Sequence, residues 1–169
     1  MYMSAGAWLE RKNKMDEEFA LFFNDVPTKD QAFVSELDVF LLEKGSKRTI
    51  KAAKSGYVTS YTSPKTKKIL LNYVFRKTGV KIRIYAQNVE KYDELLADIP
   101  DNMKKDIIKA GDCKKLTGGK CSSICTGGYI FQMDNVEYRK CKNTAFFHSL
   151  TEENYDAILG IIKSEIGKN

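Results

Sequence analysis

Four cysteines lie close together in the sequence and are the residues best suited to chemistry. Cys113, Cys121, Cys125 and Cys141 fall within 29 residues of a 169-residue chain. Thiolates are soft ligands, and four of them close a tetrahedral zinc site. The spacing of Cys121 and Cys125 lets two sulfurs hold one ion from a tight turn. The sequence therefore predicts one structural zinc ion bound by these four cysteines.

Other roles for the cysteines are open at this stage. They can be four buried or loop thiols without any ligand. Lysines beside them, such as Lys114 and Lys142, would lower a thiol pKa and favour redox or nucleophilic chemistry. An iron–sulfur cluster also takes four thiolates, but the ferredoxin spacings are absent. His148, the one histidine of the chain, could replace one thiolate or act as the base of a cysteine nucleophile.

A second feature is the uneven distribution of charge along the chain, whose formal net charge is +6. Residues 44–83 contain twelve Lys or Arg and no acid, whereas residues 1–43 hold nine acids and four bases. Such asymmetry is typical of a surface that faces an anion. The basic segment predicts an anionic partner: a nucleic acid, a phosphorylated ligand or an acidic protein. The alternative is a solvated basic hairpin without a partner.

Aromatic and basic side chains alternate along strands predicted inside this segment. Arg83 and Tyr85 project from one face of a strand over residues 80–86, and tyrosines of an earlier strand are expected to share that face. Such a face can stack a base or a sugar while an arginine binds phosphate. The alternative is that a helix covers the tyrosines as core residues. The predicted anion- or ligand-binding residues are Tyr57, Tyr61, Arg76, Arg83 and Tyr85.

The hydrophobic pattern predicts an α+β fold. Helices are expected over residues 1–24 and 28–44, followed by a meander of strands over 56–62, 69–75 and 80–86. Two short helices then begin at Asn88 and Asp101, a loop covers 111–128, a hairpin spans 129–142, and a last helix follows a capping box at 149–152. We expect one domain over residues 15–169, with residues 1–14 as a candidate N-terminal extension. Its antiparallel sheet would have about five strands, the meander plus the C-terminal hairpin, packed against helices.

Composition and motifs argue against several classes of protein. Hydrophobic residues make up 43% of the chain and charged residues 30%, as in ordinary soluble globular proteins. No stretch approaches the ~18 apolar residues of a membrane helix, and the first 14 residues lack the apolar run of a signal peptide. We therefore expect a cytoplasmic protein with reduced cysteines and no membrane contact. No phosphate-binding loop, dinucleotide fingerprint or nucleophile elbow occurs.

Several stretches resemble a group of small bacterial proteins that have no established activity. They are residues 53–61 (AKSGYVTSY), 71–86 (LNYVFRKTGVKIRIYA), 125–131 (CTGGYIF) and 138–141 (YRKC), in that order. The resemblance covers roughly residues 15–166. Relatives in the group carry one more cysteine shortly after the position of Cys141, whereas residues 142–148 contain none. The resemblance implies a shared C-terminal cysteine cluster and supplies no catalytic residue.

These features together predict a non-catalytic binding domain. A four-cysteine zinc site would hold its C-terminal hairpin to the preceding loop, and the basic sheet surface would bind the anionic partner. Two other classes stay open: a cysteine-dependent enzyme or redox protein, and a small-molecule sensor built on the tyrosine and arginine face. If phosphate contacts dominate the binding, affinity should fall steeply with salt.

Overall fold

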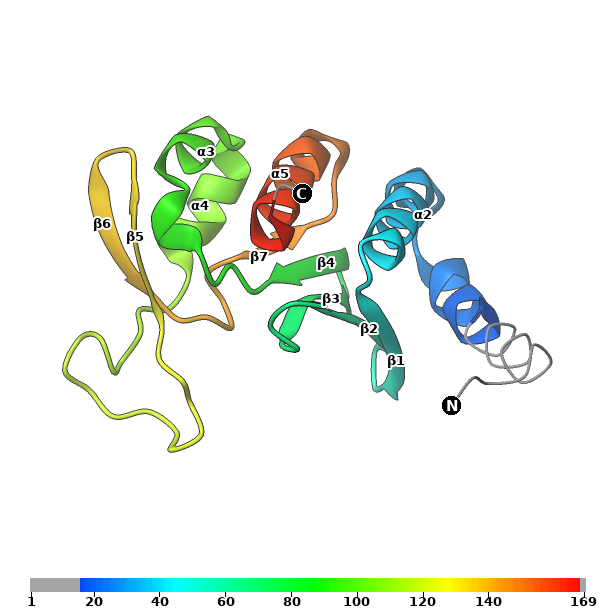
Figure 1. Ribbon diagram of the computed structural model, residues 1–169, viewed down its shortest axis with the longest axis horizontal. Coiled ribbons are helices and arrows are strands. Elements are labelled where there is room, and N and C mark those ends of the chain that lie inside the picture. The colour runs from blue at the N-terminus through cyan, green and yellow to red at the C-terminus, as the bar shows by residue number, and fades with distance from the viewer. Residues whose placement is uncertain (1–15, 168–169) are drawn as a thin grey trace.

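The computed structural model describes residues 16–167 of the chain, and Figure 1 shows how its helices and strands are arranged. The first described helical residues are 16–25, and Pro27 separates them from α2 (Thr28–Glu43). This break is the one predicted, because proline fixes φ and lacks the N–H that a continuous helix needs. The candidate extension at residues 1–14, and the start of the helix expected over 1–24, lie outside the described residues.

Five antiparallel strands form the main sheet, in the order β1-β2-β3-β4-β7. Their bounds are β1 (Lys47–Ala53), β2 (Gly56–Thr62), β3 (Ile69–Arg76), β4 (Gly79–Ile84) and β7 (Phe147–Ser149). Strands β2 to β4 are the predicted meander. The pattern missed β1, which has few apolar residues, and β7, which has only three residues. Both segments are strands because they pair with a neighbouring strand. The periodicity of their own residues gives no sign of that pairing.

The predicted hairpin exists, with β5 (Tyr129–Met133) and β6 (Val136–Lys140), but it forms a two-stranded sheet of its own. Asp134 and Asn135 turn the chain, and both have positive φ angles, of 52° and 63°, as this tight hairpin turn requires. Alternate residues of β5 are buried, and the strand packs against η1 (Val89–Lys91) and α3 (Asp93–Asp98). The α+β class and the five-stranded antiparallel sheet are confirmed, but the expectation that the hairpin joins this sheet is wrong, because β1 and β7 pair with the two edges of the meander instead.

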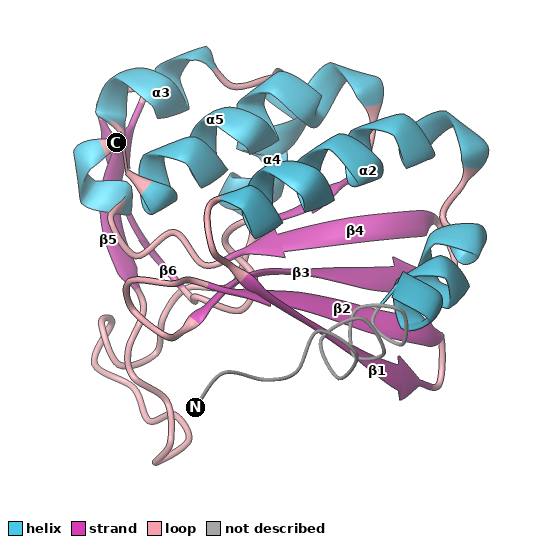
Figure 2. Cartoon of the chain, turned by 45° about the vertical axis from the view of Figure 1, so that its right-hand side comes forward, coloured by secondary structure: helices cyan, strands magenta, loops and turns pink. Residues whose placement is uncertain are grey.

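The remaining helices cover one face of the main sheet. Figure 2 shows α2, α4 (Asp101–Lys109) and α5 (Tyr155–Ile166) on the same side of the strands. A short 3₁₀ turn, η2 (Glu152–Asn154), leads into α5. Between the two layers lies the core, whose fully buried sheet residues include Tyr61, Leu71, Tyr73, Ile82 and Ile84. Each such side chain contributes about 1.5–3 kcal/mol relative to an exposed position. None of the described helices covers the opposite face, which we call the open face.

The helices predicted from the sequence are present, with small shifts at their ends. The helix expected from Asn88 divides into η1 and α3, and the last helix begins as the 3₁₀ turn η2. Among the described residues, no helix combines the length and the apolar character that crossing a bilayer requires.

Candidate functional site

All four cysteines line one cavity of about 860 Å³ at the end of the main sheet. Cys113 is buried, Cys125 and Cys141 are half-buried, and Cys121 is exposed. The fold thus brings together the residues that the sequence analysis singled out. Within residues 16–167, however, no group of three or more Cys, His, Asp or Glu side chains is close enough to hold one metal ion. The zinc ion therefore stays a prediction.

Cys113 and Cys141 belong to the rigid side of this cavity. They flank an isolated antiparallel bridge between Asp112 and Lys140. Cys113 donates its backbone N–H to the carbonyl of Arg139 at 2.8 Å, and Cys141 donates to the carbonyl of Gly111 at 2.9 Å. This hydrogen-bond pattern places both cysteines on the same face of a short ladder.

Cys121 and Cys125 lie on the long loop between α4 and β5, drawn in yellow-green in Figure 1. A backbone hydrogen bond from Gly127 holds the pKa of the Cys125 thiol below its usual value, against the opposing effect of burial. A hydrogen bond with Cys121 and the charges of Lys115 and Lys142 act in the same direction. These contacts favour a thiolate, the form that binds metal and attacks electrophiles.

The sequence did not predict that two further lysines of the cavity would lie near the cysteines. Lys67 and Lys68 belong to the turn between β2 and β3, far from the cysteines in sequence, and both line the cavity. Tyr85, predicted for the sheet surface, lines it too. The run of basic residues was the only signal for the two lysines, and it did not reveal which part of the chain they would face.

His148 does not line the cysteine cavity. Its side chain is fully buried on β7, where Nδ1 lies 3.0 Å from the carboxylate of Asp106 on α4. The roles suggested for it as a fourth ligand or as the base of a cysteine nucleophile are therefore wrong for this arrangement. The residue is instead a buried polar contact between the sheet and a helix.

The strand register separates the residues predicted to share the Arg83 face. Arg83 lies across from Asn72 on β3, and Asn72 lies across from Ser60 on β2. Tyr61 is one position along from Ser60 and therefore points to the opposite, helix-covered face. Tyr57 points to the same side as Tyr61 and packs against the core. The prediction that Tyr57 and Tyr61 share a face with Arg83 is wrong. Alternation shows which residues of one strand point to the same side, but the register between strands decides which residues of different strands share a side.

On the open face, three cations surround one aromatic ring. The charged groups of Arg83, Lys81 and Arg76 lie 4.5, 4.7 and 5.6 Å from the ring centroid of Phe147. We call these four residues the Phe147 cluster. The Arg83 side chain is held in place by hydrogen bonds to the carbonyl of Asn143 at 2.8 Å and to the side chain of Asn72 at 3.4 Å. None of the three cations forms an ion pair with any carboxylate in the described part of the chain.

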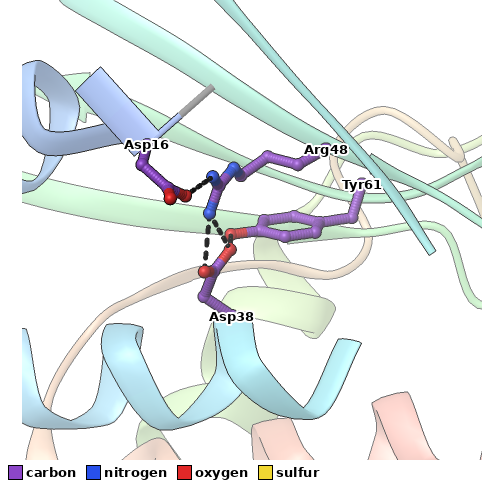
Figure 3. Close-up of polar contacts among 4 residues, drawn as sticks. All are labelled: Asp16, Asp38, Arg48 and Tyr61. Carbon is purple, nitrogen blue, oxygen red and sulfur yellow. Dashed lines mark hydrogen bonds and ion pairs between the residues drawn. The ribbon is translucent and has the colours of Figure 1, made fainter. Parts of the chain in front are cut away.

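On the helix-covered face, Arg48 of β1 meets carboxylates, as Figure 3 shows. Its guanidinium lies 2.6 and 2.7 Å from the two carboxylate oxygens of Asp38 on α2, and 3.6 Å from Asp16. The hydroxyl of Tyr61 donates to Asp38 at 2.6 Å. Burial, together with the negative charge of Asp38, raises the pKa of Tyr61 far above its usual value. We call Asp16, Asp38, Arg48 and Tyr61 the Arg48 cluster, which joins α2 to the edge strand.

Comparison with known proteins found no family model that matches the chain, and no curated protein or solved structure with a significant match. The functional interpretation therefore depends on the geometry of two sites: the Phe147 cluster on the open face and the cysteine cavity at the end of the main sheet.

Proposed function

We propose that this chain is a non-catalytic binding domain whose anionic partner contacts the open face of the main sheet. One observation carries the proposal: Arg76, Lys81 and Arg83 gather around Phe147 with no carboxylate paired to them within residues 16–167. Three positive charges gathered around one ring repel one another. An anion bound among them would replace that repulsion with attraction.

The ring of Phe147 offsets only part of the repulsion. A cation over an exposed aromatic ring gains about 0.5–1 kcal/mol. Because cations already lie around the ring, it is a poor platform for stacking a nucleotide base. Its role in the proposal is to hold the three charged groups in position for an incoming anion.

Phosphate is the anion that suits these groups best. Arginine guanidinium groups bind phosphate through two parallel hydrogen bonds, and lysine adds a point charge. The same face carries Lys47 and Lys51 on β1, at the far edge of the sheet, since Lys51 lies across from Val58 and thus shares the side of Lys81. A chain of phosphates that crosses the sheet can reach both edges. We therefore favour a nucleic-acid backbone over a single phosphorylated metabolite.

The test measures fluorescence anisotropy of labelled single-stranded DNA and RNA on addition of the full chain, over a series of salt concentrations. Three phosphate contacts should give a slope of about −2 in a plot of log affinity against log salt, at about −0.7 per contact. Arg83→Gln should weaken binding, and Lys163→Gln, which removes a charge from α5 on the other side of the molecule, should not.

Competitors distinguish the kinds of anionic partner. If a mononucleotide displaces the oligonucleotide at equal phosphate concentration, the partner is a small phosphorylated ligand. If polyglutamate binds with the higher affinity, it is an acidic protein. An affinity that does not change with salt, or that Arg83→Gln leaves unaltered, would contradict the proposal.

A further inference from the structure

The cysteine cavity contains two pairs of thiols that differ in how firmly the fold holds them. Cys113 and Cys141 are fixed by backbone hydrogen bonds on either side of the bridge between Asp112 and Lys140. Residues placed diagonally on one face of such a ladder have Cα atoms about 7–8 Å apart, within reach of longer side chains. Two sulfurs at that spacing can turn toward a common ion at the usual Zn–S distance of about 2.3 Å.

Lys140 anchors this fixed pair from the other side of the ladder. Its ammonium group donates to the carbonyls of Ile108 and Ala110, each at 2.9 Å, and to the carboxylate of Asp112 at 2.8 Å. The side chain of Lys140 is 8% exposed. The end of α4 and the end of β6 are thereby tied together, and the two cysteines between them have a rigid base.

Cys121 and Cys125 form the second pair, on a loop that extends away from the body of the fold in both Figure 1 and Figure 2. A turn closed by the hydrogen bond from the N–H of Cys125 to the carbonyl of Ser122, at 3.1 Å, sets the spacing of this pair. Between them Ile124 is 88% exposed. An aliphatic side chain so exposed gains free energy if the loop moves to cover it.

The end of the loop is built to pass close to the fixed pair. A Cβ atom at Gly128 would lie 2.4 Å from the Cβ of Cys113 and 2.7 Å from its sulfur, so only glycine lets the chain approach Cys113 at this point. Just before it, Gly127 has a φ of +99° and no atom within 4 Å of its Cβ position. The backbone therefore has a tight contact at Gly128 and freedom to pivot at Gly127.

The positive charge around the cavity suits a metal ion bound by four thiolates. Four thiolates and one divalent ion carry a net charge of −2, which a cavity without cations would not stabilise. Lys67 and Lys68 from the turn between β2 and β3, and Lys114 and Lys142 from the cysteine region, all line the cavity, together with one acid, Asp112. Excess positive charge around four soft ligands suits a tetrathiolate metal centre.

We propose that the cavity is a binding site for one soft divalent metal ion, with Zn²⁺ as the expected ion, which forms when the loop carrying Cys121 and Cys125 closes onto Cys113 and Cys141. The four sulfurs would complete a tetrahedron, as in structural zinc sites. The described arrangement, in which no three ligands converge, is then the open form. The metal ion would order the loop, since binding free energy of this kind is also folding free energy. This proposal does not depend on the anionic partner of the open face.

The first experiment uses the full chain, reduced and freed of metal, titrated with Co²⁺ and then with Zn²⁺. The expected result is visible absorption typical of tetrahedral cobalt with sulfur ligands, saturating at one ion per chain and lost when Zn²⁺ displaces the cobalt. Alkylation followed by mass spectrometry should find all four cysteines protected with Zn²⁺ and modified without it. Protection of only two cysteines would overturn the four-ligand site.

Variants from each pair test whether both take part. Cys121→Ser and Cys141→Ser should each lower Zn²⁺ affinity by at least about 100-fold in competition with a chromophoric chelator, because loss of an outer-shell partner alone costs about 10–100-fold. Ser123→Ala, in the same loop, is the matched control and should bind as the wild type does. If Cys141→Ser binds normally, the ion is held by the loop alone and the proposal is wrong.

Proteolysis tests the closure without relying on affinity. Lys120 directly precedes Cys121 and is exposed, so trypsin should cut after it in the metal-free protein, and Zn²⁺ should slow that cleavage at least tenfold. Cleavage at an unchanged rate would overturn the closure. Absence of Zn²⁺ binding tighter than about 1 μM, a modest affinity, or a disulfide between Cys121 and Cys125 that persists under mild reduction, would overturn the metal site itself.

Discussion

Arg48 and Arg83, both in the main sheet, each place a guanidinium group over a phenylalanine ring, but their surroundings give them opposite roles. The guanidinium of Arg48 lies 4.2 Å from the ring of Phe19, and that of Arg83 lies 4.5 Å from the ring of Phe147. Arg48 is buried between the sheet and α2 and has the carboxylate of Asp38 at 2.6 Å. Arg83 is half-buried on the open face, with two further cations and no carboxylate paired to it in the described residues.

The difference shows that a run of basic residues is not by itself a binding surface. Both arginines belong to the acid-free segment 44–83, yet Arg48 is buried on the helix-covered face whereas Arg83 lies on the open face, where a partner can reach it. Arg48 is part of the structure that holds α2 on the edge strand. The comparison can be tested by removing charges from each region and measuring stability and binding separately.

The largest effect is expected from Asp38→Ala. This change leaves the buried guanidinium of Arg48 without its nearest carboxylate and the hydroxyl of Tyr61 without its acceptor. Breaking a buried pair from one side costs about 3–5 kcal/mol, so the free energy of unfolding should fall by about that amount. Urea denaturation followed by circular dichroism measures it.

A double substitution shows whether the loss of stability in Asp38→Ala comes from the buried guanidinium of Arg48, which that change leaves without its nearest carboxylate. Asp38→Leu combined with Arg48→Met replaces the pair by apolar groups of similar size, and such replacement is often close to neutral. The double variant should therefore recover much of the stability that Asp38→Ala loses. If it is less stable than Asp38→Ala, the charges contribute more than their own desolvation costs, and the contrast with Arg83 is weaker than described.

The next effect concerns binding at the Phe147 cluster. Replacing Arg76, Lys81 and Arg83 together by glutamine should weaken oligonucleotide binding by at least about 100-fold, or about 2.7 kcal/mol, since charge-assisted hydrogen bonds contribute about 1.5–3 kcal/mol each. The slope of log affinity against log salt should fall toward zero. Anisotropy at several salt concentrations provides both numbers.

A charge-matched triple variant serves as the control for that loss. Lys91→Gln, Lys105→Gln and Lys163→Gln remove the same charge from exposed positions of η1, α4 and α5. Equal loss of binding in both triple variants would mean that net charge, and not the open face, attracts the partner.

The dependence of stability on alkaline pH tests whether the buried tyrosine next to the Arg48 cluster, Tyr73, can ionise in the folded chain. Burial, and then the charge of Asp38, raises the pKa of the Tyr73 hydroxyl above its usual value near 10. The folded chain therefore keeps a proton that the unfolded chain releases above pH 10, so stability is complete below pH 10 and falls as pH rises beyond it. Tyr73→Phe should reduce this fall by about 1.4 kcal/mol per pH unit.

Stability at neutral pH provides the complementary readout for this residue. The Tyr73 hydroxyl is buried without a hydrogen-bond partner among the described residues, so Tyr73→Phe should leave the free energy of unfolding unchanged or raise it. Both proteins should be unfolded in urea from pH 8 to pH 11. Identical pH dependence in the two proteins would show that the folded chain admits a tyrosinate at this position.

The smallest effects are expected from the exposed members of each region. The side chain of Asp16 is 61% exposed and its carboxylate lies 3.6 Å from Arg48, so Asp16→Asn should cost less than about 1 kcal/mol. Arg83→Gln should also change the free energy of unfolding by less than about 1 kcal/mol, because the lost hydrogen bond to Asn143 is offset by reduced repulsion. A large destabilisation by Arg83→Gln would assign Arg83 a structural role instead.

Much of the fold could be predicted from local patterns. The apolar stripe between residues 28 and 44 predicts α2, and the alternation of Val80, Ile82 and Ile84 predicts the buried side of β4. Asp134 and Asn135 predict the hairpin turn. These predictions succeeded because hydrogen bonds and side-chain periodicity within a short segment determine them.

The sequence predicted only part of each candidate site. The spacing of the cysteines pointed to a common site, and all four line one cavity, but nothing local indicated that Lys67 and Lys68 would join them. Similarly, Phe147 received no attention in the sequence analysis because it lies in a three-residue strand. Its place beside Arg83 follows from the pairing of β7 with β4.

The sequence alone thus determined most of the helices, the three strands of the meander, the hairpin, the basic segment and the set of cysteines, but not the two edge strands β1 and β7. Only the tertiary structure decided which basic residues are buried with a carboxylate and which face outward, and it separated Tyr61 from Arg83. The physical reason is that a strand alternates its two faces by itself, whereas register, set by pairing with distant strands, decides which of those faces the helices cover.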